Sequence, residues 1–175
     1  MTASTLKVLY GHRVTLTGRL VNGRAGRHVT ILAMPYGRKP FVFAILTTDQ
    51  TGGFSVNATP TIRTTYQAQF GGTRQSQART VGIRPTMTVH ELSNGRLLAR
   101  VEAASLLTGH VVQLQRLIGG GTWQTVAKRP LIANATATFR LLVLPTSTVR
   151  VAMSVNQAGA GYLGSTSHPL LYRAV

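Results

Sequence analysis

Hydrophobic and polar residues alternate along most of this chain, and the apolar positions are rich in β-branched side chains. In residues 13–21, Val14 and Leu16 fall on one face, and Thr15 and Thr17 fall on the other. A period of two is that of a β-strand with one buried face. The same pattern predicts further strands at 28–34, 53–60, 65–70, 79–85, 96–103, 110–118, 122–127, 136–145, 148–155 and 168–173. Residues 41–48 are apolar on both faces, as a central strand can be.

Clusters of turn-forming residues separate these predicted strands. Examples are VNGRAG at 21–26, PYGRKP at 35–40 and DQTGG at 49–53. No segment repeats its apolar residues with the helical period of 3.6 for more than a couple of turns. Many short strands with regular turns and few helix signals predict an all-β fold, an antiparallel sandwich or barrel.

The second half of the chain repeats the pattern of the first after about 83 to 85 residues. Gly26 and Ile31 correspond to Gly109 and Leu114, and Phe54 corresponds to Phe139. A repeat of this length is close to the size of one small β-sandwich. The chain is therefore predicted to form two tandem antiparallel β-sandwich domains, residues 1–84 and 85–175. Their junction at Arg84–Pro85 is short and has no Gly/Ser-rich linker, which predicts a semi-rigid connection.

Four segments carry a resemblance to a known class of repeats. They are YGHRVTLTGRLVNGRAGRHVTI (10–31), GGFSVNATPTIRTTYQA (52–68), VGIRP (81–85) and LQRLIGGGTWQTVA (114–127). They resemble the tandem Ig-like or fibronectin-III-like repeats of bacterial, especially actinobacterial, surface and secreted proteins. The second half departs from the pattern, because SNGRLLARV (93–101) lacks the Tyr-Gly opening. The resemblance implies Ig-like sandwiches in a non-catalytic structural or adhesive module, extracellular or at the cell surface, and it carries over no catalytic residue.

The charge of the chain is strongly one-sided. Nineteen Lys and Arg residues stand against three Asp and Glu, which gives a formal net charge of +16. The excess is +10 in residues 1–84, with eleven basic residues and one acid, and +6 in residues 85–175, with eight and two. Such a surface attracts an anionic polymer or an acidic protein. An Arg-rich composition is also what a biased genome produces, and net charge bears on association rather than on fold.

The groups that catalysis and metal binding need are scarce. The three carboxylates are Asp49, Glu91 and Glu102, and of these Glu91 and Glu102 flank a predicted hairpin that could bring them together. Asp49 occupies a typical Asx-turn position. The five histidines are not spaced as in known metal sites, and the absence of cysteine excludes disulfides and thiolate metal sites. We expect no enzyme, no cofactor and no metal.

Two basic loops are the candidate contact surface. They contain Arg24, Arg27, His28, Tyr36, Arg38 and Lys39. Loops cluster at the two ends of a sandwich, and binding sites often lie on loops. Tyr36 beside Arg38 and Lys39 could stack on and pair with an acidic glycan or a sugar–phosphate. The alternative is that these are ordinary polar hairpin tips in contact with water.

A run of three glycines precedes the single tryptophan, in IGGGTWQTVA at 118–127. A phosphate-binding loop joins a strand to a helix and places a lysine nearby, whereas here a strand is predicted on both sides. The glycines are therefore predicted to form a hairpin turn with positive φ. Trp123 is predicted to fill the core of the second domain.

Two other functions remain open at this point. An accessory or decoration component of a virion or filament would use the basic surface to dock and exposed strand edges for self-assembly. The lack of an apolar signal-peptide stretch in MTASTLKVLYG (1–11) favours that alternative. A non-specific nucleic-acid binder would use charge alone. Specific reading of nucleic acid is not expected, because the aromatic motifs and the recognition helix are missing. A membrane span is not expected either, because no apolar stretch is long enough.

Overall fold

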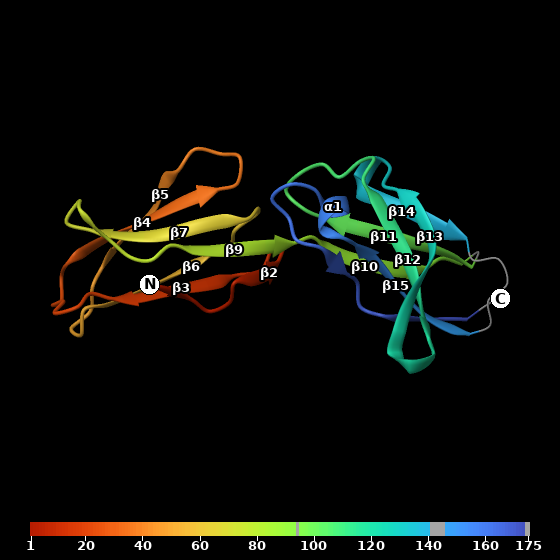
Figure 1. Cartoon of the computed structure of the whole chain (residues 1–175), viewed down its shortest axis with the longest axis horizontal. Coiled ribbons are helices and arrows are strands. Elements are labelled where there is room, and N and C mark those ends of the chain that lie inside the picture. Colours follow the sequence, from red (N-terminus) through yellow and green to blue (C-terminus); the bar gives the residue numbers. More distant parts are fainter. Residues whose placement is uncertain (94, 141–145, 174–175) are drawn as a thin grey trace. The chain divides into compact units, whose positions relative to one another are not determined.

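The computed structural model describes residues 1–93, 95–140 and 146–173. Contacts between residues divide the chain into two compact units, Met1–Ile83 (unit 1) and Arg84–Val175 (unit 2) (Figure 1). Each unit consists of two antiparallel sheets. The predicted fold class, an all-β chain with two sandwich units, is confirmed.

Unit 1 has a small sheet and a large sheet. The small sheet has the order β1 (Thr2–Ala3), β3 (Val14–Arg19), β6 (Gly53–Ala58). The large sheet has the order β2 (Lys7–Leu9), β9 (Arg79–Arg84), β7 (Thr64–Phe70), β4 (His28–Pro35), β5 (Phe41–Thr47), and the short β8 (Arg74–Gln75) pairs with β7. The alternation read from the sequence sets the buried face, because Val14 and Leu16 of β3 and Val29 and Ile31 of β4 are almost fully buried.

Unit 2 repeats this plan. The small sheet has the order β10 (Thr86–Glu91), β11 (Arg96–Glu102), β14 (Thr136–Arg140). The large sheet has the order β13 (Thr122–Pro130), β12 (Val111–Ile118), β15 (Ser147–Met153), β16 (Ser165–Thr166), and β17 (Leu170–Tyr172) also pairs with β15. Two single 3-10 turns lie at Gly119–Gly121 and Ala133–Ala135. The strand predicted at 136–145 is observed over Thr136–Arg140, and residues 141–145 lie outside the described part of the chain.

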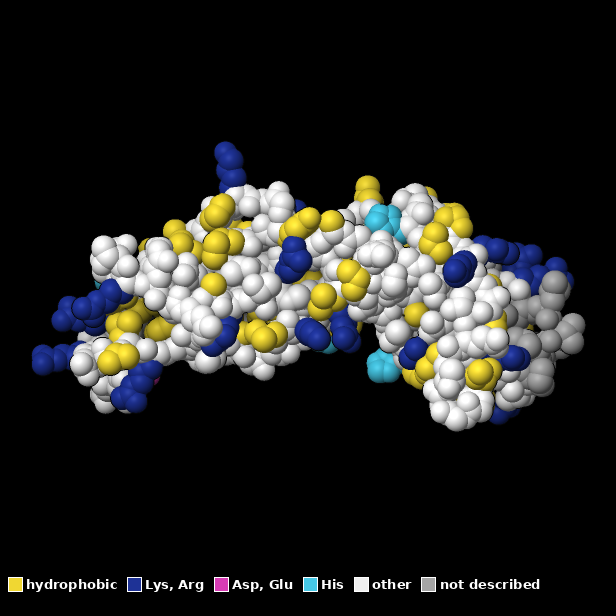
Figure 2. Space-filling model, in the orientation of Figure 1, with side chains coloured by type: hydrophobic (Ala, Val, Ile, Leu, Met, Phe, Trp, Pro, Cys, Tyr) yellow, Lys and Arg dark blue, Asp and Glu magenta, His cyan; other side chains and the backbone are white. Residues whose placement is uncertain are grey.

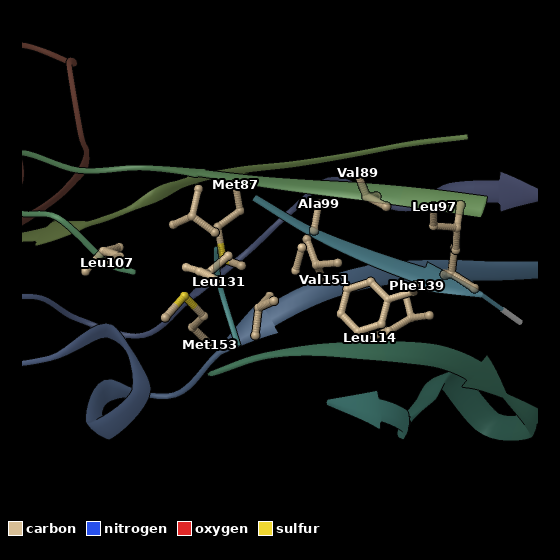
Figure 3. Packing of buried hydrophobic residues seen from close by; sticks show 14 of the residues in the cluster. Met87, Val89, Leu97, Ala99, Leu107, Leu114, Leu131, Phe139, Val151 and Met153 are labelled. Atoms are coloured by element: carbon tan, nitrogen blue, oxygen red, sulfur yellow. The ribbon is translucent and has the colours of Figure 1, made fainter. Parts of the chain in front are cut away.

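The core of unit 2 lies between its two sheets. Figure 3 shows Leu97 and Ala99 of β11 and Phe139 of β14 meeting Leu114 of β12 and Val151 of β15. All five side chains are at most 1% exposed. These residues stand at every second position of their strands, as the sequence predicted for β11 and β12.

The prediction for residues 41–48 is wrong in one respect, and one helix was not predicted. The apolar segment at 41–48 forms β5, which is an edge strand of the large sheet rather than a central one. An apolar run has no period from which its number of neighbours can be read. Helix α1 (Val155–Ala158) was not predicted from the sequence, although Ser154 and Gln157 form a capping box at its start.

Candidate binding surface at one end of unit 1

The six predicted contact residues fall into two separate groups. Arg24, Arg27 and His28 lie at the start of β4, and the other three, Tyr36, Arg38 and Lys39, lie in the turn after it. All six are exposed. Strand β4 has eight residues and rises by about 3.3 Å per residue, so the two groups lie at opposite ends of unit 1. They do not form one site.

The turn after β4 is held by contacts within the chain. The Tyr36 N–H donates to the Arg63 carbonyl at 2.8 Å, and the Arg38 N–H donates to the Pro35 carbonyl at 3.1 Å. The Arg63 guanidinium lies 4.5 Å from the centre of the Tyr36 ring. One face of this ring is therefore covered by a cation–π contact.

The start of β4 borders a cleft with a volume of about 660 Å³. The cleft lies at the end of unit 1 where β3 and β7 end and β4 begins. Four arginines line it, Arg19, Arg24, Arg27 and Arg74, and no Asp or Glu does. Figure 2 shows dark-blue side chains gathered at this end of unit 1, at the left of the view. The sequence predicted Arg24 and Arg27 but not Arg19 and Arg74, which come from other strands.

The backbone that carries Arg24 and Arg27 is fixed by Thr48. The Thr48 hydroxyl donates to the Arg24 carbonyl at 2.6 Å and accepts from the Arg27 N–H at 3.0 Å. The Thr48 N–H also donates to the Arg27 carbonyl at 2.9 Å, and the Thr48 carbonyl accepts from the Gly26 N–H at 3.0 Å. Because Thr48 is only 4% exposed, these bonds compete little with water and hold the loop in one conformation.

Arg19 is held in place by the turn between β5 and β6. Its Nε donates to the Thr51 carbonyl at 2.6 Å. Asp49 shapes this turn, since its Oδ1 accepts from the Thr51 hydroxyl, the Thr51 N–H and the Gly53 N–H, each at 2.8 Å. The Thr51 hydroxyl is the largest cause that lowers the pKa of Asp49, with further contributions from both N–H groups and from the charge of Arg19. The predicted Asx turn is confirmed, and this carboxylate is committed to the turn.

Two aromatic side chains, Phe54 and Phe70, contribute to the apolar part of the cleft beside aliphatic residues. Phe54 is 9% exposed, and its ring lies directly over Gly18 of β3. A Cβ atom on Gly18 would overlap this ring, so the glycine makes room for it. Phe70, at the end of β7, is half-buried and also lines the cleft. The cleft thus combines cationic groups with an aromatic surface.

The remaining carboxylates and the histidines form no common site. Thr86 pairs with Glu102 and Glu91 pairs with Leu97, so Glu91 and Glu102 lie at opposite ends of the β10–β11 pair and do not approach each other. Glu102 instead forms an ion pair with Arg100 at 3.2 Å. The described residues contain no group of three or more His, Asp or Glu that could hold a metal. No helix in the described ranges is long and apolar enough to cross a membrane.

The glycine run forms the predicted hairpin turn, but Trp123 is not in the core. Gly120 and Gly121 have φ of 74° and 76°. A bulge between Leu114 and Gln115 shifts the register of β12 against β13. Trp123 is half-buried outside the core cluster, under the Arg150 guanidinium at 4.1 Å from its ring centre. The prediction for Trp123 is wrong, because a bulge cannot be read from the alternation alone.

Comparisons with known proteins identify no family. No protein-family profile matches the chain, and no curated protein does. Three solved structures that match are a cytokine receptor complex, the BSP domain of a biofilm-associated protein, and the D0–D1 domain of intimin. Their identities are 16%, 9% and 13%, and their TM-scores are 0.40, 0.37 and 0.34. The matches cover 98%, 99% and 98% of this chain and 97%, 29% and 96% of the other chain. At these values nothing about a ligand or partner follows from them.

Proposed function

We propose that this chain is a non-catalytic adhesive module that acts at a cell surface or outside the cell and contacts an anionic polymer or an acidic protein. The observation that carries the proposal is the cleft of unit 1, which four arginines line without any carboxylate. Arginine stays protonated at every physiological pH, and its planar group binds carboxylates, sulfates and phosphates through two parallel hydrogen bonds.

Two of the three carboxylates are engaged in contacts within the chain, which supports a binding role. General acid–base chemistry needs a titratable group free to exchange a proton with a substrate. Asp49 accepts three hydrogen bonds in its turn, and Glu102 is paired with Arg100. The net charge of +16 adds long-range attraction for a polyanion.

The experiment is a titration of the full chain with heparin, with polygalacturonate and with neutral dextran. We expect binding to both polyanions but not to dextran. We also expect the affinity to fall steeply between about 50 and 200 mM salt, because binding releases counterions. Absence of polyanion binding at low salt, or an affinity that salt does not change, contradicts the proposal. Duplex DNA is the competitor, and a clear preference for DNA would favour the nucleic-acid alternative.

Strand β5 supports a second candidate function, that of an assembly component. Among the described strands, β5 pairs with β4 alone, and it contains no charged residue. Its side chains Phe41, Val42 and Ile45 are 52%, 53% and 67% exposed. Natural edge strands are usually protected by charges, prolines or bulges. Strand β5 has a bulge at Phe43, where its register against β4 shifts, but it has no charge or proline, and an apolar edge invites another strand. We propose that a second copy of this chain pairs its own β5 with this edge, around a two-fold axis.

Sedimentation equilibrium over a wide concentration range tests this candidate. We expect a dimer that dissociates on dilution, and we expect Ile45→Lys to abolish it. Val155→Lys is the matched control, because Val155 has a similar exposure of 56% but lies on α1. A monomer at the highest concentration, or equal effects of the two substitutions, would rule out pairing through β5.

A further inference from the structure

We propose that the cleft of unit 1 binds an acidic sugar, a uronate residue within an anionic glycan chain. This inference rests on the proposed binding function and specifies its ligand. The volume of about 660 Å³ lies within the roughly 300–1,000 Å³ range of small-molecule sites. The cleft is therefore large enough to enclose part of a ligand instead of contacting it across a flat surface.

The lining of the cleft matches the three kinds of surface on a uronate. The carboxylate matches the arginines, Arg24 and Arg27 on one wall and Arg19 and Arg74 on the others. The apolar C–H face of a sugar ring matches Phe70, because the face of an aromatic ring is electronegative and attracts the positive edge of its neighbour.

The hydroxyl groups match side-chain amides. Gln69, Gln75 and Gln77 line the same cleft, and each amide offers two donor hydrogens and an acceptor oxygen. A hydroxyl both donates and accepts, so an amide can serve it in either role. A simple anion would use the arginines alone, whereas a sugar uses all three kinds of group.

Both walls of the cleft are fixed before a ligand arrives. Thr48 holds the wall that carries Arg24 and Arg27 through its hydroxyl and backbone. On the side of the cleft formed by β7, Ser76 holds this strand, because its hydroxyl accepts from the Ala68 N–H at 3.0 Å and its carbonyl accepts from the Gln67 amide at 3.0 Å. A preformed site loses little conformational entropy on binding.

The shape of the site favours a sugar over a peptide or a nucleic acid. An extended peptide is commonly bound by adding a strand to an open sheet edge, whereas this cleft lies at the end of the sandwich and is lined by side chains and connections. Single-stranded nucleic acid is bound along a groove with successive aromatic platforms. Here Phe54 and Phe70 share one cleft, and Phe54 is nearly buried.

The test compares two double variants of the full chain that lose the same charge. R24Q/R27Q removes two arginines from the cleft, and R38Q/K39Q removes two charges from the turn at the other end of β4. All four residues are exposed, so both variants are expected to fold, which thermal unfolding checks. The titrants are tetragalacturonate, neutral maltotetraose and tetraglutamate, each measured by calorimetry.

We expect tetragalacturonate to bind and maltotetraose not to bind. R24Q/R27Q should weaken the binding at least about tenfold, because a hydrogen-bonded charge pair is lost, and R38Q/K39Q should weaken it less than about threefold. Phe70→Leu should weaken the binding of tetragalacturonate more than it weakens any binding of tetraglutamate, because only the sugar stacks on the ring.

Every other outcome overturns the inference in a distinguishable way. Equal losses in the two double variants would assign binding to diffuse charge and leave the proposed function standing. Heparin carries sulfates as well as uronates, so binding of heparin without binding of tetragalacturonate would assign the cleft to sulfate groups and reject the uronate as sufficient, but not the polyanion. Tighter binding of tetraglutamate than of tetragalacturonate would assign the cleft to an acidic peptide. Absence of all polyanion binding would reject both proposals.

Discussion

The connection between β3 and β4 in unit 1 has the same backbone hydrogen bonds as the connection between β11 and β12 in unit 2. The side chains that fill this end of the sandwich differ between the units. In unit 1 the Gly26 N–H donates to the Thr48 carbonyl, and in unit 2 the Gly109 N–H donates to the Leu131 carbonyl. The return bonds also match, from the Thr48 N–H to the Arg27 carbonyl and from the Leu131 N–H to the His110 carbonyl. Residue by residue, Arg24 therefore corresponds to Leu107, and Thr48 corresponds to Leu131.

The side chains at these equivalent positions have opposite roles. Leu107 and Leu131 are 2% and 1% exposed and belong to the core of unit 2. In unit 1 the Thr48 hydroxyl bonds the Arg24 carbonyl, and the Arg24 side chain is exposed beside the cleft. Two leucines fill the end of one sandwich, whereas an arginine and a threonine leave the other open. A shared backbone thus supports either a packed end or an open cleft.

The end of unit 2 has an additional cover. Helix α1 brings the Gln157 carbonyl within 2.7 Å of the His110 Nδ1 atom. The Tyr162 hydroxyl accepts from the Ser105 N–H at 3.1 Å. These contacts tie the connection between β15 and β16 to the connection between β11 and β12. The corresponding connection of unit 1 is the tight β7–β8 turn with Gly71 and Gly72, which has no helix.

The edge strands of the two large sheets also differ, and again unit 1 is the unit less protected from contacts. β5 of unit 1 contains no charged residue, whereas its counterpart β13 in unit 2 contains Lys128 and Arg129 and ends at Pro130. Charges and proline on an edge discourage pairing with another chain. Unit 1 therefore carries both candidate contact surfaces, and unit 2 has the features of a closed structural domain.

The largest expected effect comes from giving unit 2 the arginine of unit 1. Leu107→Arg removes a buried leucine and brings a charge to its place, so we expect unit 2 to lose about 3–5 kcal/mol of unfolding free energy. Urea unfolding of the full chain measures this. The neighbour Leu106 is 92% exposed, and Leu106→Arg should change the stability by less than about 0.5 kcal/mol. Similar losses in the two variants would mean that Leu107 does not pack as described.

A smaller loss of unfolding free energy is expected when the packing of the Phe54 ring on Gly18 beside the cleft is disturbed. Gly18→Ala places a methyl group against the Phe54 ring, which has to move, and we expect a cost of about 1–3 kcal/mol in unit 1. Gly119→Ala is the control, because a Cβ atom there meets nothing within 4 Å. Thermal unfolding compares the two variants. A neutral Gly18→Ala would show that the ring has room to shift.

The hydroxyl of Thr48 should contribute less than the ring packing. Thr48→Val keeps the shape but leaves the Arg24 carbonyl and the Arg27 N–H without that partner, so we expect a loss of about 1–2 kcal/mol. Amide hydrogen exchange at Arg27 should become faster, because its N–H then lacks an acceptor. Thr47 is exposed at the end of β5, and Thr47→Val should leave both quantities almost unchanged. Unchanged exchange in Thr48→Val would contradict the positioning role of the hydroxyl.

The smallest expected effect is on the stability of unit 1 at acidic pH, through Asp49. The hydrogen bonds from Thr51 and Gly53 keep the pKa of Asp49 below its ordinary value in the folded chain. Asp49 therefore stabilises unit 1 above the unfolded-state value of about 4, and this contribution is lost as the pH falls through the lower folded-state value. Urea midpoints measured from pH 7 down to pH 2 should fall less in Asp49→Asn than in the wild type. Glu91→Gln, with the same change of charge, should retain the wild-type pH profile of unit 1.

The sequence predicted most of the strands but only part of the candidate site. Alternation located β3, β4, β7, β11 and β12 and identified their buried faces, because a strand buried on one face has a period of two in any tertiary context. The basic loops predicted from the sequence included Arg24 and Arg27, but that prediction grouped these two residues with Arg38 and Lys39 at the opposite end of β4. Arg19 and Arg74 stand on other strands, and no local pattern connects them to that loop.

By itself the sequence determined the class of fold, the repeat of about 83 to 85 residues and the excess of positive charge, since each depends on local pattern or on composition alone. Only the tertiary structure decided that β5 is an edge, that Trp123 lies outside the core, and that one sandwich end is open while the other is filled. These outcomes depend on which strands become neighbours and where a bulge shifts their register. They also depend on whether a loop side chain turns into the core, as Leu107 does, or stays in water, as Arg24 does.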